Sequence, residues 1–192
     1  MSRRFSVLPE KLEEAVLQER LRAIRLLALD VDGVLTDGRI VYGNYGDELK
    51  FFDVQDGFGL YLLRRAGIRT AFITAKKSTV VSRRAKENHV DKVYQNARDK
   101  LKVYGKMKRH FRVKDEEICF MGDDLIDLPI MVRAGVAISA PNAVEAVRER
   151  SHYLTKSLGG RGAVREVVDM ILKSQQKLES LIQEYQAFQA PS

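Results

Sequence analysis

Short, mostly apolar runs alternate along this chain with longer segments of helical periodicity. Each apolar run is too short for a helix and too apolar for a surface loop, so it predicts a buried strand. The predicted strands are residues 26–29, 69–74, 92–94, 117–121 and 136–138. The helical patterns begin near residues 9, 57, 78, 99, 125 and 142. This alternation predicts an α/β protein with a mostly parallel sheet covered on both faces, a Rossmann-like three-layer α/β/α fold.

Two further segments lie outside this alternation. Residues 39–52 hold two short alternating runs around a Gly/Asn/Asp turn, which predicts a β-hairpin flap directly after the first strand. Residues 159–188 begin with a glycine-rich stretch and continue as an amphipathic helix. The second half of that helix, residues 178–188, is a candidate subunit contact. With no repeat or linker, we expect one domain over residues 1–192, opened by a helix at 9–25.

Composition and charge limit the classes of protein to which this chain can belong. Hydrophobic residues make up 45% of the chain, as in ordinary globular proteins. We find no apolar run of about 20 residues and no signal-peptide pattern, and we expect a cytoplasmic protein without a membrane partner. The single cysteine, Cys119, lies in an apolar run and reads as a buried small hydrophobe. The net charge of +7 is spread along helices and interleaved with acids, so we expect no nucleic-acid partner.

The first predicted strand ends in two carboxylates, Asp30 and Asp32, and then a glycine. Side chains alternate along a strand, so both carboxylates point to the same side at its carboxyl end, where open α/β sheets bind ligands. Crowded carboxylates resist ionisation unless a cation lies between them, and oxygen ligands favour Mg²⁺ or Ca²⁺. A helix-loop-helix calcium site is excluded, because its glycine and glutamate positions hold Leu35 and Val41.

Polar residues also close or follow the other strands. Thr74 ends the predicted strand 69–74, and Lys100 lies at the start of the helix after strand 92–94. An acidic group follows strand 117–121. That group consists of Asp123, Asp124 and Asp127. Alone, Thr74 is an ordinary cap and Lys100 an ordinary solvated lysine. Because parallel strands end at one edge of a sheet, these residues are expected to meet there and bind a phosphoryl group.

These motifs, in this order, resemble those of the haloacid dehalogenase-like (HAD) phosphohydrolase superfamily. Between about Ile24 and Leu172 the chain is similar to the cap-less phosphatases of 3-deoxy-D-manno-octulosonate 8-phosphate (Kdo-8-phosphate) and related nonulosonate 9-phosphates. The stretches that carry the likeness are 30–38, Lys50 with Phe52, 56–57, 122–129 and 159–166. The resemblance implies a HAD-like fold without a cap domain and a Mg²⁺-dependent phosphatase of lipopolysaccharide biosynthesis.

The resemblance also implies residue roles. Asp30 is the nucleophile that forms an aspartyl-phosphate, and Asp32 is the acid and base. Mg²⁺ is bound by Asp30, the Asp32 carbonyl and Asp123, with Asp124 and Asp127 in support. Thr74 and Lys100 bind phosphate, Lys76 and Arg161 are candidate substrate contacts, and the implied assembly is a homotetramer whose hairpins meet at its centre. The glycine-rich segment near Arg161 either reaches a neighbouring active site or is a mere turn.

Several positions depart from the family pattern, among them Asn96, which follows Gln95 where the family has Gln-Gly before the lysine motif. Gln55 replaces an arginine, and Ala75 with Lys76 replaces Gly-Arg. Lysine lacks the two-pronged geometry that arginine offers a carboxylate, so the identity of the sugar acid stays open between Kdo-8-phosphate and a nonulosonate 9-phosphate.

Two other functions compete with a phosphatase. A phospho-accepting receiver domain also uses aspartates, a threonine and a lysine, but receivers place their acidic pair first, whereas here the second acidic pair comes last. A non-catalytic regulatory or oligomerisation domain with inherited motifs is the other alternative, and the intact Asp32 and Lys100 argue against it.

Overall fold

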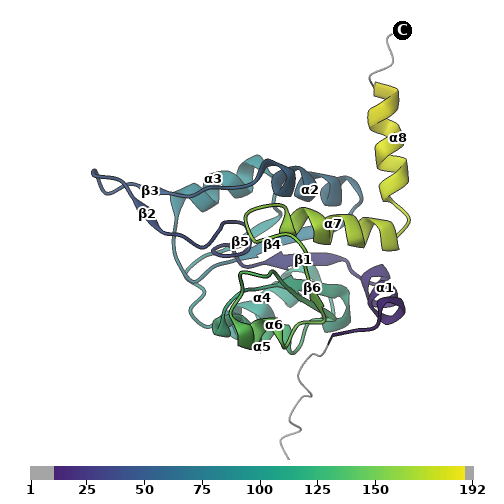
Figure 1. Cartoon of the computed structure of the whole chain (residues 1–192), viewed down its shortest axis with the longest axis horizontal. Helices are drawn as coiled ribbons and strands as arrows, with labels where there is room; N and C mark the ends of the chain where they lie inside the picture. Colours follow the sequence, from purple (N-terminus) through teal and green to yellow (C-terminus); the bar gives the residue numbers. More distant parts are fainter. Residues whose placement is uncertain (1–10, 189–192) are drawn as a thin grey trace, which may run out of the picture.

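A six-stranded parallel sheet forms the centre of the protein in the computed structural model, which describes residues 11–188 (Figure 1). The strands are β1 (Leu26–Leu29), β4 (Arg69–Ile73), β5 (Lys92–Tyr94), β6 (Ile118–Met121), β7 (Val136–Ser139) and β8 (Tyr153–Leu154). They lie in the order β5-β4-β1-β6-β7-β8, and every neighbouring pair is parallel. The predicted α/β fold is confirmed, and β1 lies in the interior of the sheet.

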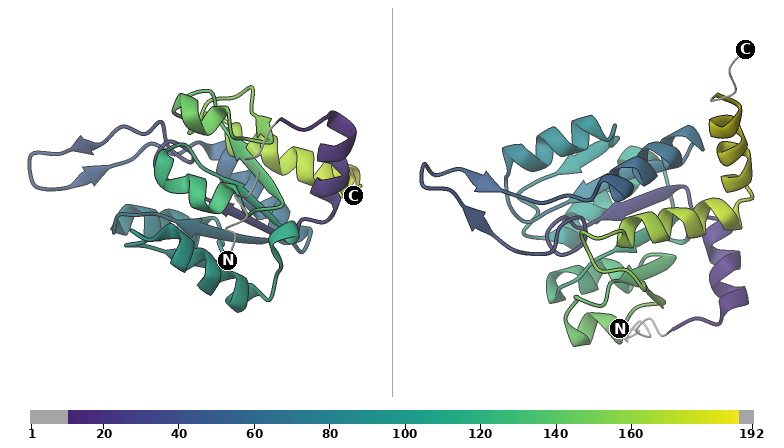
Figure 2. Two further views of the ribbon diagram at one scale, coloured as in Figure 1. Left: turned by 90° about the horizontal axis from the view of Figure 1, so that it is seen from below. Right: turned by 45° about the horizontal axis from the view of Figure 1, so that its top comes forward.

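Helices cover both faces of this sheet (Figures 1 and 2). The helices are α1 (Glu14–Arg22), α2 (Val54–Arg65), α3 (Thr79–Glu87), α4 (Lys100–Phe111), α5 (Leu128–Met131), α6 (Glu145–Arg148), α7 (Ala163–Ser174) and α8 (Leu178–Phe188). Leu27 and Leu29 pack with α1, α2, α3 and α7, whereas Leu26 and Ala28 pack with α4, α5 and α6. Because β1 is buried on both faces, its sequence is continuously apolar.

The β-hairpin follows β1 after a short loop and projects from the body (Figure 2). It consists of β2 (Val41–Tyr42) and β3 (Glu48–Leu49), paired antiparallel. Between β1 and α2 the described chain holds this hairpin and no larger insertion. The predicted β-hairpin after the first strand is therefore confirmed.

Several boundaries differ from the sequence-based expectation. Helix α2 begins at Val54 instead of near residue 57, because the Asp53 side chain caps the helix by accepting hydrogen bonds from two backbone N–H groups. Strand β8 was not predicted, since two residues carry too little periodicity. The helix expected over 9–25 spans only Glu14–Arg22 in the described chain, and residues 9 and 10 lie outside it.

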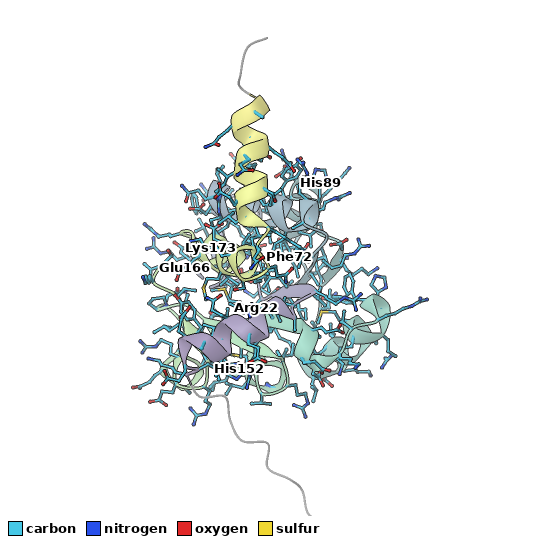
Figure 3. The ribbon with its side chains drawn as sticks, turned by 90° about the vertical axis from the view of Figure 1, so that its right-hand side faces the viewer. Arg22, Phe72, His89, His152, Glu166 and Lys173 are labelled. Carbon is cyan, nitrogen blue, oxygen red and sulfur yellow. The ribbon has the colours of Figure 1, made fainter. Side chains whose placement is uncertain are left out.

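The predicted helix over 163–188 is interrupted. Gln176 adopts a positive φ of 56°, which ends the α7 region, and α8 leaves α7 at a steep angle (Figures 1 and 3). Tyr185 of α8 contacts Phe58 edge to face, with ring centroids 5.5 Å apart. None of the described helices is both long enough and apolar enough to cross a membrane.

Asp56 joins α2 to the start of α7. Its side chain is almost fully buried and accepts hydrogen bonds from the backbone N–H groups of Arg165 (2.8 Å) and Gly162 (3.4 Å). The cap residue Gly162 has no side chain to cap α7, so the distant carboxylate performs that function. Burial raises the pKa of Asp56 to about 6.

We expect Asp56→Ala to lower the free energy of unfolding by about 1–3 kcal/mol, because it leaves buried backbone donors unpaired. Asp56→Asn keeps one acceptor oxygen and should lose less. Urea unfolding measures the loss in both variants.

The folded-state pKa of Asp56 lies above the ordinary value of 3.8, so wild type should lose stability relative to Asp56→Asn as pH rises from about 4 to 6. A flat difference over this range would contradict the assignment.

Candidate active site

A buried ion-pair network lies at the carboxyl end of β1. Asp30 directly follows β1, and Lys100 is the first residue of α4. The Lys100 Nζ lies 2.7 Å from Asp30 Oδ1 and 2.6 Å from Asp127 Oδ1. The exposed fractions of the Lys100, Asp30 and Asp127 side chains are 1%, 8% and 0%. One ammonium group therefore holds two carboxylates in a nearly dry environment.

Asp127 fixes the acidic loop after β6. Its Oδ2 accepts hydrogen bonds from the backbone N–H groups of Asp123 (3.1 Å) and Asp124 (3.3 Å). Gly122 makes this contact possible, because a Cβ at that position would lie 2.5 Å from the Asp127 Cβ. Asp124 is exposed and accepts a hydrogen bond from its neighbour, the Leu125 N–H, at 2.7 Å. The loop thus carries Asp123 to the side of Asp30.

The carboxylates of Asp30, Asp123 and Asp127 each place an oxygen within 4.8 Å of the others. Burial, followed by the charge of Asp127, raises the pKa of Asp30 to about 6. Burial and then the charge of Asp30 raise the pKa of Asp123 to about 8. Burial opposes the charge on Lys100, but the two carboxylates outweigh it and raise its pKa. Despite this ammonium, the cluster has an excess of negative charge, and its all-oxygen donors fit a hard divalent cation such as Mg²⁺.

A cavity of about 260 Å³ opens beside this cluster. Its lining residues are Asp30, Asp32, Gly38, Ile40, Thr74, Ala75, Lys76, Asp123, Asp124 and Ile126. Thr74 lies buried just beyond β4, and its hydroxyl oxygen accepts a hydrogen bond from the Lys76 N–H at 3.4 Å. Lys76 is exposed at the rim. The cavity therefore combines acidic, hydroxyl and cationic groups, which suits a phosphorylated ligand.

The glycine-rich segment packs against the loop that follows Asp30. A Cβ on Gly159 would lie 1.9 Å from the Gly33 carbonyl oxygen, and Gly160, at φ +68°, donates a hydrogen bond to the Val34 carbonyl at 2.9 Å. Asn142 joins both segments: its Nδ2 donates to the Gly33 carbonyl at 2.8 Å and its Oδ1 accepts from the Gly159 N–H at 2.7 Å. The segment supports the loop after Asp30 within the same chain. Arg161 is exposed and does not line the cavity.

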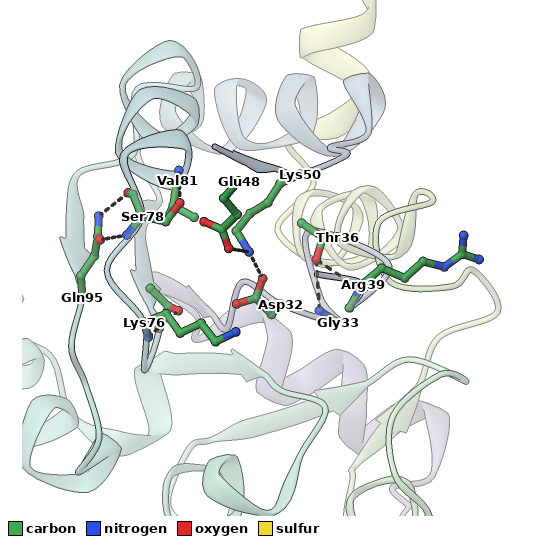
Figure 4. Close-up of polar contacts among 12 residues, drawn as sticks. Asp32, Gly33, Thr36, Arg39, Glu48, Lys50, Lys76, Ser78, Val81 and Gln95 are labelled. Atoms are coloured by element: carbon green, nitrogen blue, oxygen red, sulfur yellow. Dashed lines mark hydrogen bonds and ion pairs between the residues drawn. The ribbon is translucent and has the colours of Figure 1, made fainter. Parts of the chain in front are cut away.

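Sequence reasoning assigned no role to Lys50, Glu48 or Asn142. The Lys50 ammonium pairs with Asp32 Oδ1 and lies 3.1 Å from Glu48 Oε1 (Figure 4). Two signals were available: Lys50 belongs to a stretch that carries the family likeness, and the Glu-x-Lys spacing on a predicted strand places both side chains on one face. For Asn142, the position at a helix start gave no hint of its contacts with two loops.

Comparison with known proteins agrees with this geometry. The family described as haloacid dehalogenase-like hydrolase matches residues 66–167. A 3-deoxy-D-manno-octulosonate 8-phosphate phosphatase of Yersinia pestis is 42% identical over 161 residues, which is 84% of this chain and 86% of the relative. The chain belongs to the haloacid dehalogenase-like hydrolases. A relative of the same name in Escherichia coli K12 is 41% identical over 81% of this chain and 83% of its own length.

Solved structures of haloacid dehalogenase-like hydrolases share the fold. The Moraxella catarrhalis phosphatase, solved with magnesium ion, phosphate ion and a KDO molecule, aligns with a TM-score of 0.88 and 40% identity over 90% of this chain and 99% of that chain. A cobalt-bound phosphatase of Haemophilus influenzae aligns with a TM-score of 0.80 and 32% identity over 82% of this chain and 92% of that chain. Both were crystallised with a divalent metal, in agreement with the acidic cluster.

Gly33 provides a test of the cation site. Its φ is +87°, and a Cβ there would lie 1.9 Å from Asp123 Oδ2. We expect Gly33→Ala to push the Asp123 carboxylate away and to weaken Mn²⁺ binding by about tenfold or more, as measured by isothermal titration calorimetry.

Gly38→Ala is the matched control. It introduces similar backbone strain, at φ +83°, but its Cβ would meet only the Gly33 backbone, at 3.5 Å and beyond. It should therefore bind Mn²⁺ within about threefold of wild type. Equal losses in the two variants would assign the effect to strain and contradict the proposed cation site.

Proposed function

We propose that this chain is a Mg²⁺-dependent phosphatase that hydrolyses 3-deoxy-D-manno-octulosonate 8-phosphate. The observation that carries the proposal is the buried Asp30–Lys100–Asp127 network, which lies with Asp123 beside a polar cavity. Relatives that are 41–42% identical over more than four fifths of the chain are phosphatases of this compound, which supports the substrate. The magnesium, phosphate and KDO in the Moraxella structure support the metal and the ligand class.

Asp30, Asp123 and the backbone carbonyl of Asp32 would hold the Mg²⁺, with Asp124 beside them. When bound, the ion supplies positive charge to the oxygens of the phosphoryl group. Thr74 and Lys100 would bind the same group from the protein side. Lys100 also keeps one Asp30 oxygen oriented, which leaves the other for attack.

In the first step an Asp30 carboxylate oxygen attacks phosphorus, and the bond from phosphorus to the sugar oxygen breaks. Asp32 transfers its proton to that leaving oxygen, so that a neutral hydroxyl departs. In the second step Asp32, now ionised, removes a proton from water, and the water oxygen attacks phosphorus. Inorganic phosphate leaves, and both the Asp30 carboxylate and the protonated Asp32 are regenerated.

Lys76 is the candidate selectivity residue within this chain. It lies exposed at the cavity rim with Ala75, where an ammonium group suits the carboxylate of a sugar acid. Gln55 and Arg161 do not line the cavity. A nonulosonate 9-phosphate carries the same carboxylate on a longer chain, and it is the second candidate substrate.

We expect the purified protein to release phosphate from Kdo-8-phosphate with Mg²⁺ and to lose that activity in excess EDTA. Asp30→Asn should lower kcat by about 10³-fold or more, because the amide is a poor nucleophile. A malachite-green assay measures both, and thermal melting checks that the variant is folded. Assays with nonulosonate 9-phosphates separate the two substrates, and a protein inactive on every sugar-acid phosphate would favour the non-catalytic alternative.

The hairpin supports a further proposal, that the protein is a homotetramer assembled through it. Large hydrophobic side chains on and around β2 and β3 face solvent within the single chain: Ile40, Tyr42, Tyr45, Leu49, Phe51 and Val54. Such a cluster exceeds the scattered exposure of a monomer and marks an interaction surface.

A buried unpaired Cys119 is compatible with the cytoplasmic location that we propose.

We expect wild type to elute as a tetramer in size-exclusion chromatography with light scattering. The double variant Tyr42→Asp/Leu49→Asp should dissociate, because it would place charges in an apolar contact. Ile182→Asp, on the exposed face of α8, is the matched control and should remain tetrameric. Dissociation by Ile182→Asp alone would move the interface to α8.

A further inference from the structure

The hairpin brings a buried lysine to the edge of the active site. Lys50 follows β3 directly, and its side chain is 1% exposed, whereas those of Asp32 and Glu48 are 27% and 24% exposed. A buried ammonium is stable only when its donors are paired. Figure 4 shows that Lys50 reaches down from the hairpin between these two carboxylates.

Glu48 holds Lys50 from the hairpin side. The two residues are two positions apart on an extended segment, so their side chains lie on the same face. Burial opposes the charge on Glu48, but hydrogen bonds from Lys50 and Ser78 outweigh it and lower its pKa. Burial likewise opposes the charge on Lys50, but Asp32 and Glu48 outweigh it and raise its pKa. Glu48 and Lys50 therefore form an ion pair beside Asp32, and Ser78, the N-cap of α3, hydrogen-bonds to Glu48.

Among the described residues that line the cavity, Lys50 has a polar contact with Asp32 alone. Asp30, Asp32 and Lys76 line the cavity, but Lys50 does not. Lys100 differs, because it contacts Asp30 and stands beside the phosphoryl position. A lysine that is 1% exposed behind Asp32 has no surface to offer a ligand, so its effect on the reaction must pass through that carboxylate.

We propose that Lys50 is a positioning residue that fixes the Asp32 carboxylate for proton transfer. The inference rests on the proposed phosphatase function, in which Asp32 protonates the leaving oxygen. Lys50 binds Oδ1 of Asp32 and leaves the second oxygen of this cavity-lining residue for the proton. Without that restraint Asp32 would rotate among staggered conformers, and proton transfer would slow.

The leaving group distinguishes this role from a merely structural one. A sugar alkoxide needs a proton to depart, whereas p-nitrophenolate does not. The quantity to compare is kcat/KM, because it reports the steps up to phosphoryl transfer to Asp30. We expect Lys50→Met to lower kcat/KM for Kdo-8-phosphate by about 10–100-fold and for p-nitrophenyl phosphate by less than about threefold. Lys50→Arg, which keeps the charge, should recover part of the loss.

The Asp32→Asn variant shows how loss of the acid alone changes kcat/KM for each of the two substrates. It should show the same dependence on the leaving group, and the double variant Asp32→Asn/Lys50→Met should be no slower than Asp32→Asn within about twofold. Multiplied losses in the double variant would show that Lys50 acts independently of Asp32 and would overturn the proposal. Equal losses of Lys50→Met on both substrates would overturn it as well.

Lys50→Met leaves two carboxylates without their partner, so its folding needs a control. The variant Glu48→Gln/Lys50→Met removes one of these charges, and thermal melting identifies the better-folded background for the kinetics. Glu48→Gln alone keeps Lys50 on Asp32 and should change kcat/KM by less than about fivefold on either substrate. A wild type inactive on both substrates would refute the phosphatase function itself, whereas an active wild type with an unaffected Lys50→Met refutes only the positioning role.

Discussion

Mutual repulsion among Asp30, Asp123 and Asp127 is the constraint around which the active site is built. One oxygen of each lies within 4.8 Å of the others, and Asp30 and Asp127 are buried while Asp123 is half-buried. Buried like charges at this distance destabilise the fold unless positive charge balances them. Lys100 supplies one such charge, and the remaining excess favours a divalent cation. The fold itself therefore creates the excess negative charge that a bound divalent cation would balance.

The parallel sheet explains why these groups meet. β1 and β6 are adjacent and parallel, so Asp30 and Asp123 leave neighbouring strands at the same edge. Close approach then depends on two glycines, since side chains at Gly33 and Gly122 would collide with Asp123 and Asp127. The hairpin begins from the loop after β1, and it returns with Lys50 over Asp32. The carboxylates of Asp30 and Asp32 are consequently held from the sheet on one side and from the hairpin on the other.

Much of this arrangement could be predicted from the sequence. The apolar runs predicted the strands, because strands follow from local periodicity. The rule that parallel strands end at one edge of a sheet predicted that Asp30, Thr74, Lys100 and Asp123 lie close together. The contacts of Lys50 could not be predicted, since they depend on the angle at which the hairpin leaves the sheet. The turn at Gln176 likewise follows from tertiary contacts of α8 and not from a glycine or proline signal.

A crystal structure grown with Mg²⁺ and beryllium fluoride, a mimic of the phosphoryl group, tests the electrostatic account most directly. The account predicts beryllium bonded to an Asp30 oxygen, the cation bound by Asp30 and Asp123, and the fluorides within hydrogen-bond distance of Lys100 and Thr74. A cation bound elsewhere, or beryllium fluoride attached to another residue, would contradict it.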